Sequence, residues 1–454
     1  MKWLSCFAAL LLLGCGGLTK KVDTHHPDVA LPPAWQTVQD PEVEAAADLT
    51  IDDLVPLESY RTLIRRALDE NPDLQLTALQ IREADLLVRD RRGARLPEIG
   101  LTVDGRRDKS AQAPDDPFTT VSGGFNLSWE LDVWGRLADA EAAARLDREV
   151  AQATYEAARR SLAARVVQRA LDILNVRRVI AIERQRLEIL ETNEEIVTAR
   201  YRAGRGELAD LETARRDSRN ARAALVALEE DANQAHRALR VLLGDLDMSH
   251  VDMPETVPEV PQVPAGMPAQ SLAQRPDLAA ALARIRAEDR RAEAAHKALL
   301  PAFRIGANWD RSGGSPSDML EGSPLWSLLG NLTAPLFQGG RLRANAQLAE
   351  LAAERAYWSY RNSLLTSVLE VETALSRERT FARQIPELEA ALEHAKASRR
   401  HFEERYREGL GDILDLLAVQ QTEFDLNVRL NQTRIDRLGN RIDLALALGL
   451  GVSE

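Results

Sequence analysis

Cysteine is almost absent from this 454-residue chain, and both cysteines, Cys6 and Cys15, lie within the first fifteen residues. The folded body therefore lacks the residues for a disulfide framework or a cysteine-rich zinc site. Aromatic residues make up only 5% of the chain and the formal net charge is −12, which argues against a nucleic-acid partner. No apolar run reaches the ~20 residues that a membrane-spanning helix needs, which excludes a helical-bundle membrane protein.

Sequence motifs of enzyme active sites are also missing. The chain contains no glycine-rich phosphate loop, no His-Glu-x-x-His metal motif and no nucleophile elbow. We therefore expect no enzymatic activity, no cofactor and no metal site.

The N-terminus has the pattern of an export signal. Lys2 precedes the apolar run 4–13, which ends at Gly14 and Cys15. This order of charge, apolar run and small residue is typical of a secretory signal. The ending Leu12-Leu13-Gly14-Cys15 resembles the bacterial lipobox, in which the cysteine carries the lipid. We predict a signal peptide over 1–14 and lipid attachment at Cys15, followed by a lipid-anchored segment over 15–56; an ordinary signal with an incidental cysteine is the alternative.

The remaining sequence repeats itself once. Asn71-Pro72-Asp73-Leu74 returns as Arg275-Pro276-Asp277-Leu278, an offset of 204 residues (275 − 71). Tyr201-Arg202-Ala203-Gly204 returns as Tyr406-Arg407-Glu408-Gly409, an offset of 205 (406 − 201), and other matches keep the same order and spacing. Such self-similarity indicates two structural copies. We place the first repeat at 57–243, a proline-rich linker or collar at 244–270, the second repeat at 271–449 and a short tail at 450–454.

Each repeat changes its hydrophobic periodicity along its length. Alternation of apolar and polar residues predicts strands over 99–105 and 121–132, separated by a polar loop over 106–120, and over 302–310 and 325–336 in the second repeat. Helical spacing predicts helices over 57–92 and 271–298, very long helices over 137–200 and 341–405, and return helices over 208–243 and 412–448. The fold is therefore mainly helical with a small β part.

The strands suit a membrane better than a soluble core. Their length of about ten residues matches the ~9–11 residues of a transmembrane β-strand, and Trp129, Trp309 and Trp326 lie on their apolar faces. A soluble two-sheet structure is the alternative, but each strand pair is isolated between long helices. Four strands cannot close a barrel, and open edges in lipid cost several kcal/mol per backbone group. We therefore expect several copies to associate.

The duplicated order of helix, strand pair, long helix and return helix resembles the TolC-like outer membrane efflux proteins. The lipobox, Asn-Pro-Asp-Leu, Ala-Arg-Leu-Pro and Tyr-x-x-Gly segments are similar to the lipidated OprM/NodT-type branch. The resemblance implies a homotrimer with a twelve-stranded β-barrel in the outer membrane and a twelve-helix α-barrel in the periplasm. It also implies a passive, lipid-anchored duct that works with a periplasmic adaptor and an inner-membrane pump of RND or ABC type.

The resemblance also assigns roles to residues at the helical turns. Tyr406 and Asp210 match a polar network that holds the periplasmic constriction closed, and Asp415 matches the carboxylate that lines its narrowest ring. The tips Gly204-Arg205 and Gly409-Leu410 match the adaptor-contacting turns. The family's further arginine aligns with Gly411 and its second acidic ring with Ala418, so the closed state is expected to rest on fewer links, or on different ones such as Asp412 or Arg407.

The polar faces of the strands are expected to line the bore, with Asn126, Glu130, Asn308 and Asp310 among them. The alternative is a protein without a pore, either a coiled-coil spacer or the periplasmic adaptor itself. The sequence does not identify the exported compound, which could be a drug, another toxic compound or a metal ion, because fold does not determine substrate.

Overall fold

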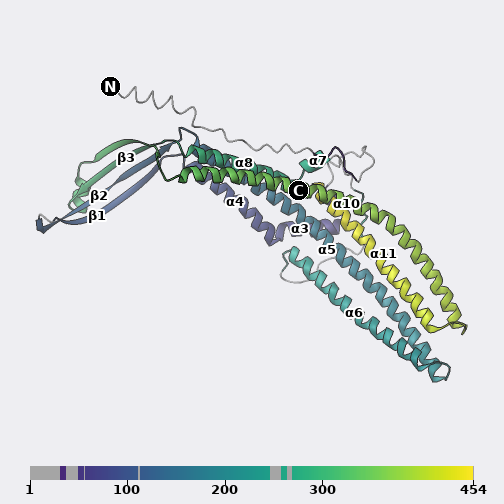
Figure 1. Cartoon of the computed structure of the whole chain (residues 1–454). Helices are drawn as coiled ribbons and strands as arrows, with labels where there is room; N and C mark the ends of the chain where they lie inside the picture. The colour runs from purple at the N-terminus through teal and green to yellow at the C-terminus, as the bar shows by residue number, and fades with distance from the viewer. Residues whose placement is uncertain are drawn as a thin grey trace. The chain divides into compact units, whose positions relative to one another are not determined.

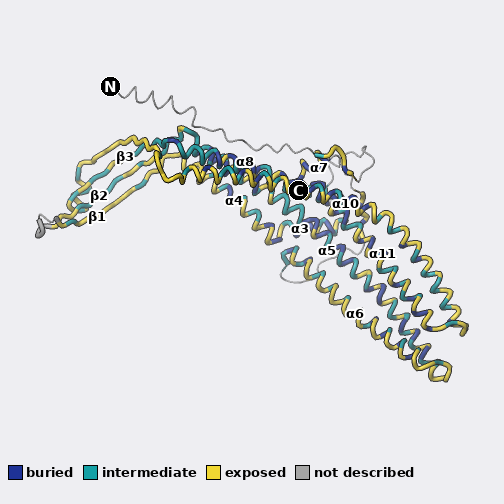
Figure 2. Tube along the Cα trace, viewed as in Figure 1, coloured by how far each residue is buried: buried dark blue, intermediate teal, exposed yellow. Residues whose placement is uncertain are grey.

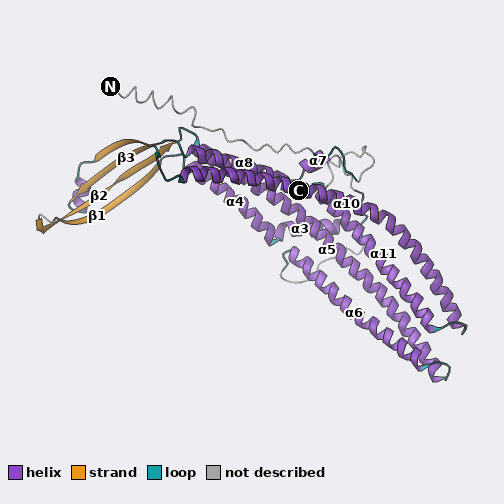
Figure 3. Ribbon diagram, in the orientation of Figure 1, coloured by secondary structure: helices purple, strands orange, loops and turns teal. Residues whose placement is uncertain are grey.

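The computed structural model describes residues 31–36, 50–55, 57–110, 113–245, 257–262 and 268–452. Cys15, the expected signal peptide and much of the expected linker lie outside these residues. The described chain is mainly helical with one small sheet, as the sequence predicted (Figure 3). Within the described residues, no helix is both long and apolar enough to cross a membrane.

The chain forms two compact units, and each contains segments of both repeats. The described parts of the first unit are Ala78–Thr154 and Asp277–Ser363; those of the second come from Ala30–Thr77, Tyr155–Pro276 and Leu364–Glu454. The first unit holds the sheet and the second holds the helical turns. Equivalent parts of the two repeats therefore belong to the same unit, although they lie about 200 residues apart in the sequence.

One antiparallel sheet joins the two strand pairs (Figure 1). Its strands are β1 (Glu98–Ser110), β2 (Ala113–Leu131), β3 (Ala302–Gly313) and β4 (Leu325–Thr333), in the order β1-β2-β3-β4. The central β2–β3 pair brings Phe125 opposite Trp309 and Asn126 opposite Asn308. In these two pairs an apolar residue meets an apolar one and a polar residue meets a polar one, as the alternation predicted; in the β3–β4 pair, Leu325 lies opposite Asp310.

The first two strands are longer than predicted, and the polar loop expected over 106–120 is mostly strand. Arg106 pairs with Thr120 and Asp108 with Phe118, followed by a register shift before Ser110. The β2–β3 ladder runs only as far as Val121, so residues 118–120 of β2 pair with β1 alone, and Pro114 and Pro117 fall at the register shift between Phe118 and Ala113. Proline is tolerated at such an irregularity because the ladder needs no backbone donor there. The charged residues after Gly105 interrupt the alternation of apolar and polar residues from which the strands were predicted. They do not prevent the backbones of β1 and β2 from pairing. β4, in contrast, ends at Thr333, before the predicted 336.

The helix expected over 57–92 is two helices, α3 (Glu58–Glu70) and α4 (Pro72–Gly93). Asn71 between them is extended, with ψ 120°, because the proline that follows disfavours the helical conformation. The Asn71 side chain accepts a hydrogen bond from the Leu74 backbone at 3.0 Å and so caps α4. The equivalent region of the second repeat divides in the same way into α7 (Pro268–Ala273) and α8 (Pro276–Lys297).

The long and return helices agree with the prediction to within two residues. They are α5 (Arg136–Arg202), α6 (Leu208–Leu242), α10 (Arg341–Arg407) and α11 (Ile413–Ala447), and α10 continues through Pro386. Short helices α2 (Ile51–Leu54) and α9 (Pro316–Glu321) complete the described elements. In the second unit, Leu171, Leu416 and Ile442 are among the fully buried side chains, and Figure 2 shows buried stretches along α5 and α11.

Candidate functional site

The two helical hairpins turn through the same local structure. The Arg205 amide donates to the Arg200 carbonyl and the Gly204 amide to the Tyr201 carbonyl, both at 2.9 Å. Equivalent bonds join Leu410 to Arg405 and Gly409 to Tyr406. This pattern ends a helix when one residue adopts positive φ, here Gly204 at +67° and Gly409 at +75°. The expected contact residues Gly204, Arg205, Gly409 and Leu410 are all exposed.

Tyr406 is the buried residue at these turns, with 5% of its surface exposed. It belongs to an apolar cluster with residues of α5, α6 and α11, including Val197, Leu211 and Leu416. The Arg200 guanidinium of α5 lies over the Tyr406 ring, 4.1 Å from its centroid. The same group donates a hydrogen bond to the Tyr406 carbonyl at 3.0 Å. Arg200 therefore ties the first hairpin to the second.

Burial, more than the surrounding charges, sets the pKa of the Tyr406 hydroxyl. Burial raises the pKa of Tyr406; the Arg200 cation opposes this, and the Asp210 carboxylate raises the pKa further. Asp210, half-buried in the first turn of α6, is therefore close enough to act electrostatically on Tyr406. The structure thus brings together two of the three residues predicted for the gate.

Asp415 lies apart from that cluster. It is exposed in the first turn of α11, whereas its neighbours Leu416 and Leu417 are buried against α5 and α6 residues. The nearby Asp412 caps α11, because its side chain accepts from the Leu414 amide at 2.9 Å. Asp415 is consequently free to face solvent or a second molecule.

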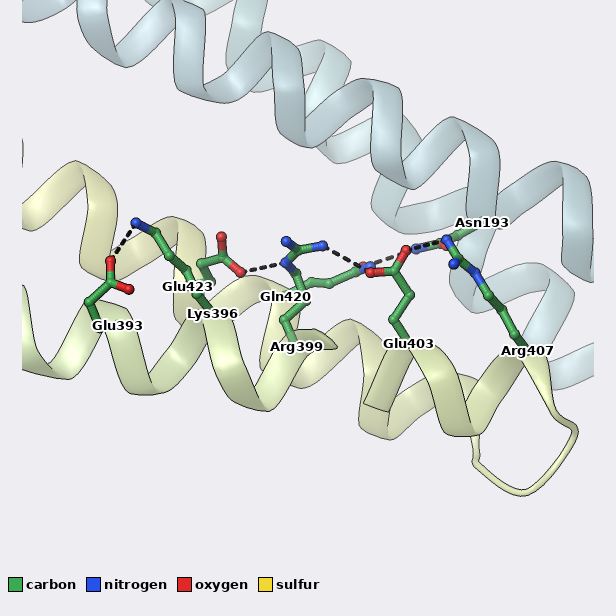
Figure 4. A network of polar contacts seen from close by, with 8 residues as sticks. All are labelled: Asn193, Glu393, Lys396, Arg399, Glu403, Arg407, Gln420 and Glu423. Carbon is green, nitrogen blue, oxygen red and sulfur yellow. Dashed lines mark hydrogen bonds and ion pairs between the residues drawn. The ribbon is translucent and has the colours of Figure 1, made fainter. Parts of the chain in front are cut away.

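A chain of polar contacts runs along the second hairpin behind its tip (Figure 4). Arg399 contacts Glu423 at 2.6 Å and Glu403 at 3.0 Å, and Glu403 also pairs with Arg407 at 2.7 Å. Arg407, one candidate for the missing closing link, is thus already paired within its own helix. Nearby, the Asn193 amide donates to the Gln420 side chain at 2.9 Å and links α5 to α11 in a buried position.

A second charge cluster lies farther along the helices. Arg437 and Arg441 of α11 both contact Glu378 of α10 at 2.8 Å, and the Glu378 side chain is only 9% exposed. Burial raises the pKa of Glu378, but the bonds and charges of the two arginines outweigh this and lower the pKa below its ordinary value. Arg441 also donates to the Val260 carbonyl, so this cluster fastens a described piece of the linker to the helices.

The polar side chains of β2 and β3 gather on one face of the sheet, to which β4 also contributes the exposed Leu325 and Leu329. Asn126 lies opposite Asn308, Asp310 opposite Gly124, and Glu130 opposite Arg304 on the polar face. Glu130 also accepts from Arg136 at 2.6 Å. The opposite face is apolar and exposed, with Leu101 at 67% and Trp326 at 78%. The four expected polar residues therefore share one face.

Sequence reasoning missed Arg200 and Glu378. Arg200 directly precedes the Tyr-x-x-Gly motif, and its counterpart Arg405 donates to the tip carbonyl of Leu410 at 3.1 Å. This repeated arginine was the one available signal. Glu378 offered none, because its partners Arg437 and Arg441 are about sixty residues away. Among the described residues, no cluster of potential metal ligands occurs.

The duplicated helix–strand architecture has a counterpart among known families. The family model described as "Outer membrane efflux protein" matches residues 63–245 and again 267–450. The chain belongs to the outer membrane efflux protein family. The two matches coincide with the two repeats, so the resemblance to TolC-like proteins is confirmed, and with it a role as an efflux channel component of the outer membrane.

Relatives within the outer membrane efflux protein family align over nearly their full length. Outer membrane protein OprJ of Pseudomonas aeruginosa is 29% identical over 98% of this chain and 96% of its own. The pyoverdine export outer membrane protein OpmQ of Pseudomonas putida is 26% identical, covering 93% and 92%. The cation efflux system protein CusC of Escherichia coli is 27% identical, covering 99% and 98%.

Solved structures share the fold. A membrane protein from Pseudomonas aeruginosa superposes with a TM-score of 0.87 at 28% identity, covering 95% of this chain and all of its own. A crystal structure of CusC gives a TM-score of 0.84 at 23% identity, covering 94% and 99%. Members of this family are channels of efflux systems rather than enzymes, and they serve as the outer membrane components of pumps.

Proposed function

We propose that three copies of this chain form the passive outer-membrane duct of a tripartite export system. The observation that supports this proposal most directly is the structure of the sheet. It has one mainly polar face, one exposed apolar face and two unpaired edges, β1 and β4. A strand edge in lipid leaves backbone groups unsatisfied at several kcal/mol each. Pairing β4 of one copy with β1 of the next removes these edges, and three copies of four strands give the twelve that the family resemblance implies.

The polar face then lines the bore, with Asn126, Glu130, Asn308 and Asp310 toward water and the apolar face toward lipid. The purified protein is expected to conduct ions across planar bilayers and to migrate as a heat-sensitive trimer. A monomer that stays in solution without detergent and does not conduct would overturn the proposal, and would favour the alternative of a spacer or adaptor without a pore.

The hairpin tips act as the gate of the duct. Tyr406, Asp210 and Arg200 hold the two hairpins of one subunit together, while the exposed Asp415 faces its copies in a ring. Three carboxylates around a narrow pore attract cations and repel one another. Asp415→Ala is expected to lower cation selectivity or to change the open probability in single-channel recordings. Unchanged selectivity and opening would remove Asp415 from the gate.

The tip residues Gly204, Arg205, Gly409 and Leu410 contact a periplasmic adaptor, which links the duct to an inner-membrane pump of RND or ABC type. Their exposure supports this role, because the adaptor needs a free surface. Site-specific photocrosslinking from position 410 in cells tests it: a single adduct with the mass of an adaptor is expected, and adducts with lipid or none would contradict it. Cys15 carries the lipid anchor, and Cys15→Ala is expected to abolish palmitate labelling.

The exported compound is a small molecule. The names of relatives mention pyoverdine, toluene and cations, so relatedness at this level does not select among them. Because a passive duct receives whatever its pump delivers, export assays in cells with and without its partner pump identify the cargo.

A further inference from the structure

Two helices of the first unit carry rows of exposed apolar side chains. The exposed side chains are Leu79 (47%), Leu86 (61%) and Leu87 (53%) on α4, and Leu348 (63%), Leu351 (57%) and Trp358 (54%) on α10. Their spacings of three, seven and eight residues place each set on one face of its helix. Alanines such as Ala84 and Ala353 are buried on the other face. Each helix therefore packs one face inside the chain and presents a second apolar face outward, which marks an interaction surface.

These two helices are connected to the two open edges of the sheet. α4 leads through residues 94–97 into β1, and β4 leads through residues 334–340 into α10. Consecutive strands of the sheet are antiparallel, so β4 of one copy placed beside β1 of the next continues the alternation. Joining the edges in this way brings α4 of one copy beside α10 of its neighbour.

The apolar residues lie at matching distances from the sheet. Leu86 is seven residues from the sheet-side end of α4 (93 − 86), and Leu348 is seven from that of α10 (348 − 341). At 1.5 Å per residue both are about 10 Å from the helix end. Leu79, at fourteen residues (93 − 79), falls between Leu351 at ten (351 − 341) and Trp358 at seventeen (358 − 341). Leu86 and Leu348 therefore lie level with each other, and Leu79 fits between Leu351 and Trp358.

The rows also carry opposite charges at equivalent places. Glu83 lies four residues after Leu79 and three before Leu86, and Arg355 lies four residues after Leu351 and three before Trp358. Glu83 and Arg355 are both exposed, so each charge can reach a neighbouring copy. Along the helix axes they lie about 15 and 21 Å from the sheet-side ends, a difference that the two long side chains can bridge.

We propose that the α4 row of one copy packs against the α10 row of the next, with Trp358 as an anchor at the end of the contact farthest from the sheet and Glu83 paired with Arg355. The inference rests on the proposed assembly and names the helical contact that holds it together beside the sheet. A partly exposed tryptophan next to an arginine suits such an anchor, because tryptophan and arginine are enriched among the residues that dominate interface energies; the Arg361 guanidinium lies 5.3 Å from the Trp358 ring centroid.

Cysteine crosslinking tests the contact directly. The only natural cysteines are Cys6 and Cys15, so new pairs report without interference from the folded body. The variant Leu86→Cys with Leu348→Cys, oxidised in isolated outer membranes, is expected to give a ladder of covalent dimers and trimers that reductant removes, because helices at 8–10 Å bring facing cysteines within bonding range. The control pair Leu86→Cys with Arg343→Cys, whose second cysteine points about 140° away on α10, is expected to give none.

The outcomes separate this inference from the proposed function. Trimers on native gels without the Leu86–Leu348 ladder, or with an equal ladder in the control, would overturn the contact and leave the duct intact. A protein that forms no oligomer by any measure would remove both.

Charge exchange provides a second test that does not depend on disulfide geometry. Glu83→Arg alone and Arg355→Glu alone are expected to dissociate the trimer on heating in detergent at a temperature where the parent remains assembled. The double exchange is expected to restore assembly. A double variant at least as unstable as the two single variants combined would contradict the pairing of Glu83 with Arg355.

Discussion

At the scale of single residues, one arginine connects the two hairpins of a subunit. The Arg200 guanidinium contacts the Tyr406 ring and its carbonyl at once, and a cation over an aromatic ring contributes about 0.5–2 kcal/mol. The resemblance directed attention to position 411, where this chain has glycine. The structure supplies the positive charge from the other hairpin instead.

Removal of this cation should loosen the tips. Arg200→Ala is expected to destabilise the closed state relative to the open state by about 1–2 kcal/mol, because a stacked cation and a charged hydrogen bond are lost together. That is a rise of roughly five- to thirty-fold in the ratio of open to closed channels, measured as open probability in planar bilayers. Arg202→Ala, an exposed arginine of the same helix, is the matched control. Equal openings in both variants would show that Arg200 does not hold the tips.

Glu378 makes a residue-scale prediction about pH. Its carboxylate is stabilised by Arg437 and Arg441, which lower its pKa, so the folded protein binds this proton more weakly than the unfolded chain. The stabilisation is therefore complete above the ordinary glutamate pKa and lost as pH falls through the lowered value. Glu378→Gln is expected to cost about 3 kcal/mol at neutral pH, because two cations lose their buried partner, and much less in acid.

The measurement is thermal unfolding of the parent and variant at neutral and acidic pH. The control is Glu389→Gln. Glu389 lies in α10 like Glu378, and it forms an exposed ion pair with Arg434 of α11 at 2.6 Å. Loss of this pair is expected to lower the free energy of unfolding by less than about 1 kcal/mol. If Glu378→Gln lowered the free energy of unfolding by no more than this control, the Glu378 cluster would contribute no more to stability than an exposed ion pair.

At the scale of secondary-structure elements, glycines at helix ends and inside helices have opposite roles. Gly409 adopts positive φ at the tip, where a β-carbon is strained. Gly439 lies inside α11, and a β-carbon added there would have open space around it, with no atom within 4 Å. Gly409→Ala is expected to destabilise the tip by about 1 kcal/mol, and Gly439→Ala to stabilise α11 by about 0.5–1 kcal/mol.

Hydrogen exchange of the tip amides, with thermal unfolding in parallel, checks both signs. Faster exchange at residues 405–412 in Gly409→Ala and slower exchange in α11 of Gly439→Ala are the expected results. A tip whose exchange did not change in Gly409→Ala would mean that the turn is held by its surroundings rather than by its own backbone.

At the scale of the whole molecule, the two faces of the sheet should tolerate charge differently. Leu101 and Thr102 are consecutive residues of an edge strand with side chains on opposite faces. Leu101→Arg places a cation toward lipid and is expected to cost about 2–4 kcal/mol of assembly stability, whereas Thr102→Arg faces the bore and costs little. The yield of heat-resistant trimer in outer membranes measures the difference. Equal yields would mean that the apolar face does not meet lipid.

The elements themselves could be predicted closely because their signals are local. The ends of α6 and α11, the glycine turns and the two faces of each strand follow from neighbours a few residues apart. The same locality explains the errors. Pro72 breaks the helix expected over 57–92, and the polar stretch 106–120 pairs as strand because its backbone bonds do not depend on hydrophobic side chains.

The amino-acid sequence by itself determined the duplication, the helical rods, the tight turns and the alternation of the strands, because each arises from periodicity or from the backbone preference of glycine and proline. Only the tertiary structure decided that β2 pairs with β3 across the two repeats, that Arg200 lies on Tyr406 and that Arg437 and Arg441 enclose Glu378. Those contacts join residues far apart in the chain, and nothing in the spacing of the residues specifies which distant partner a strand edge or a charge will meet.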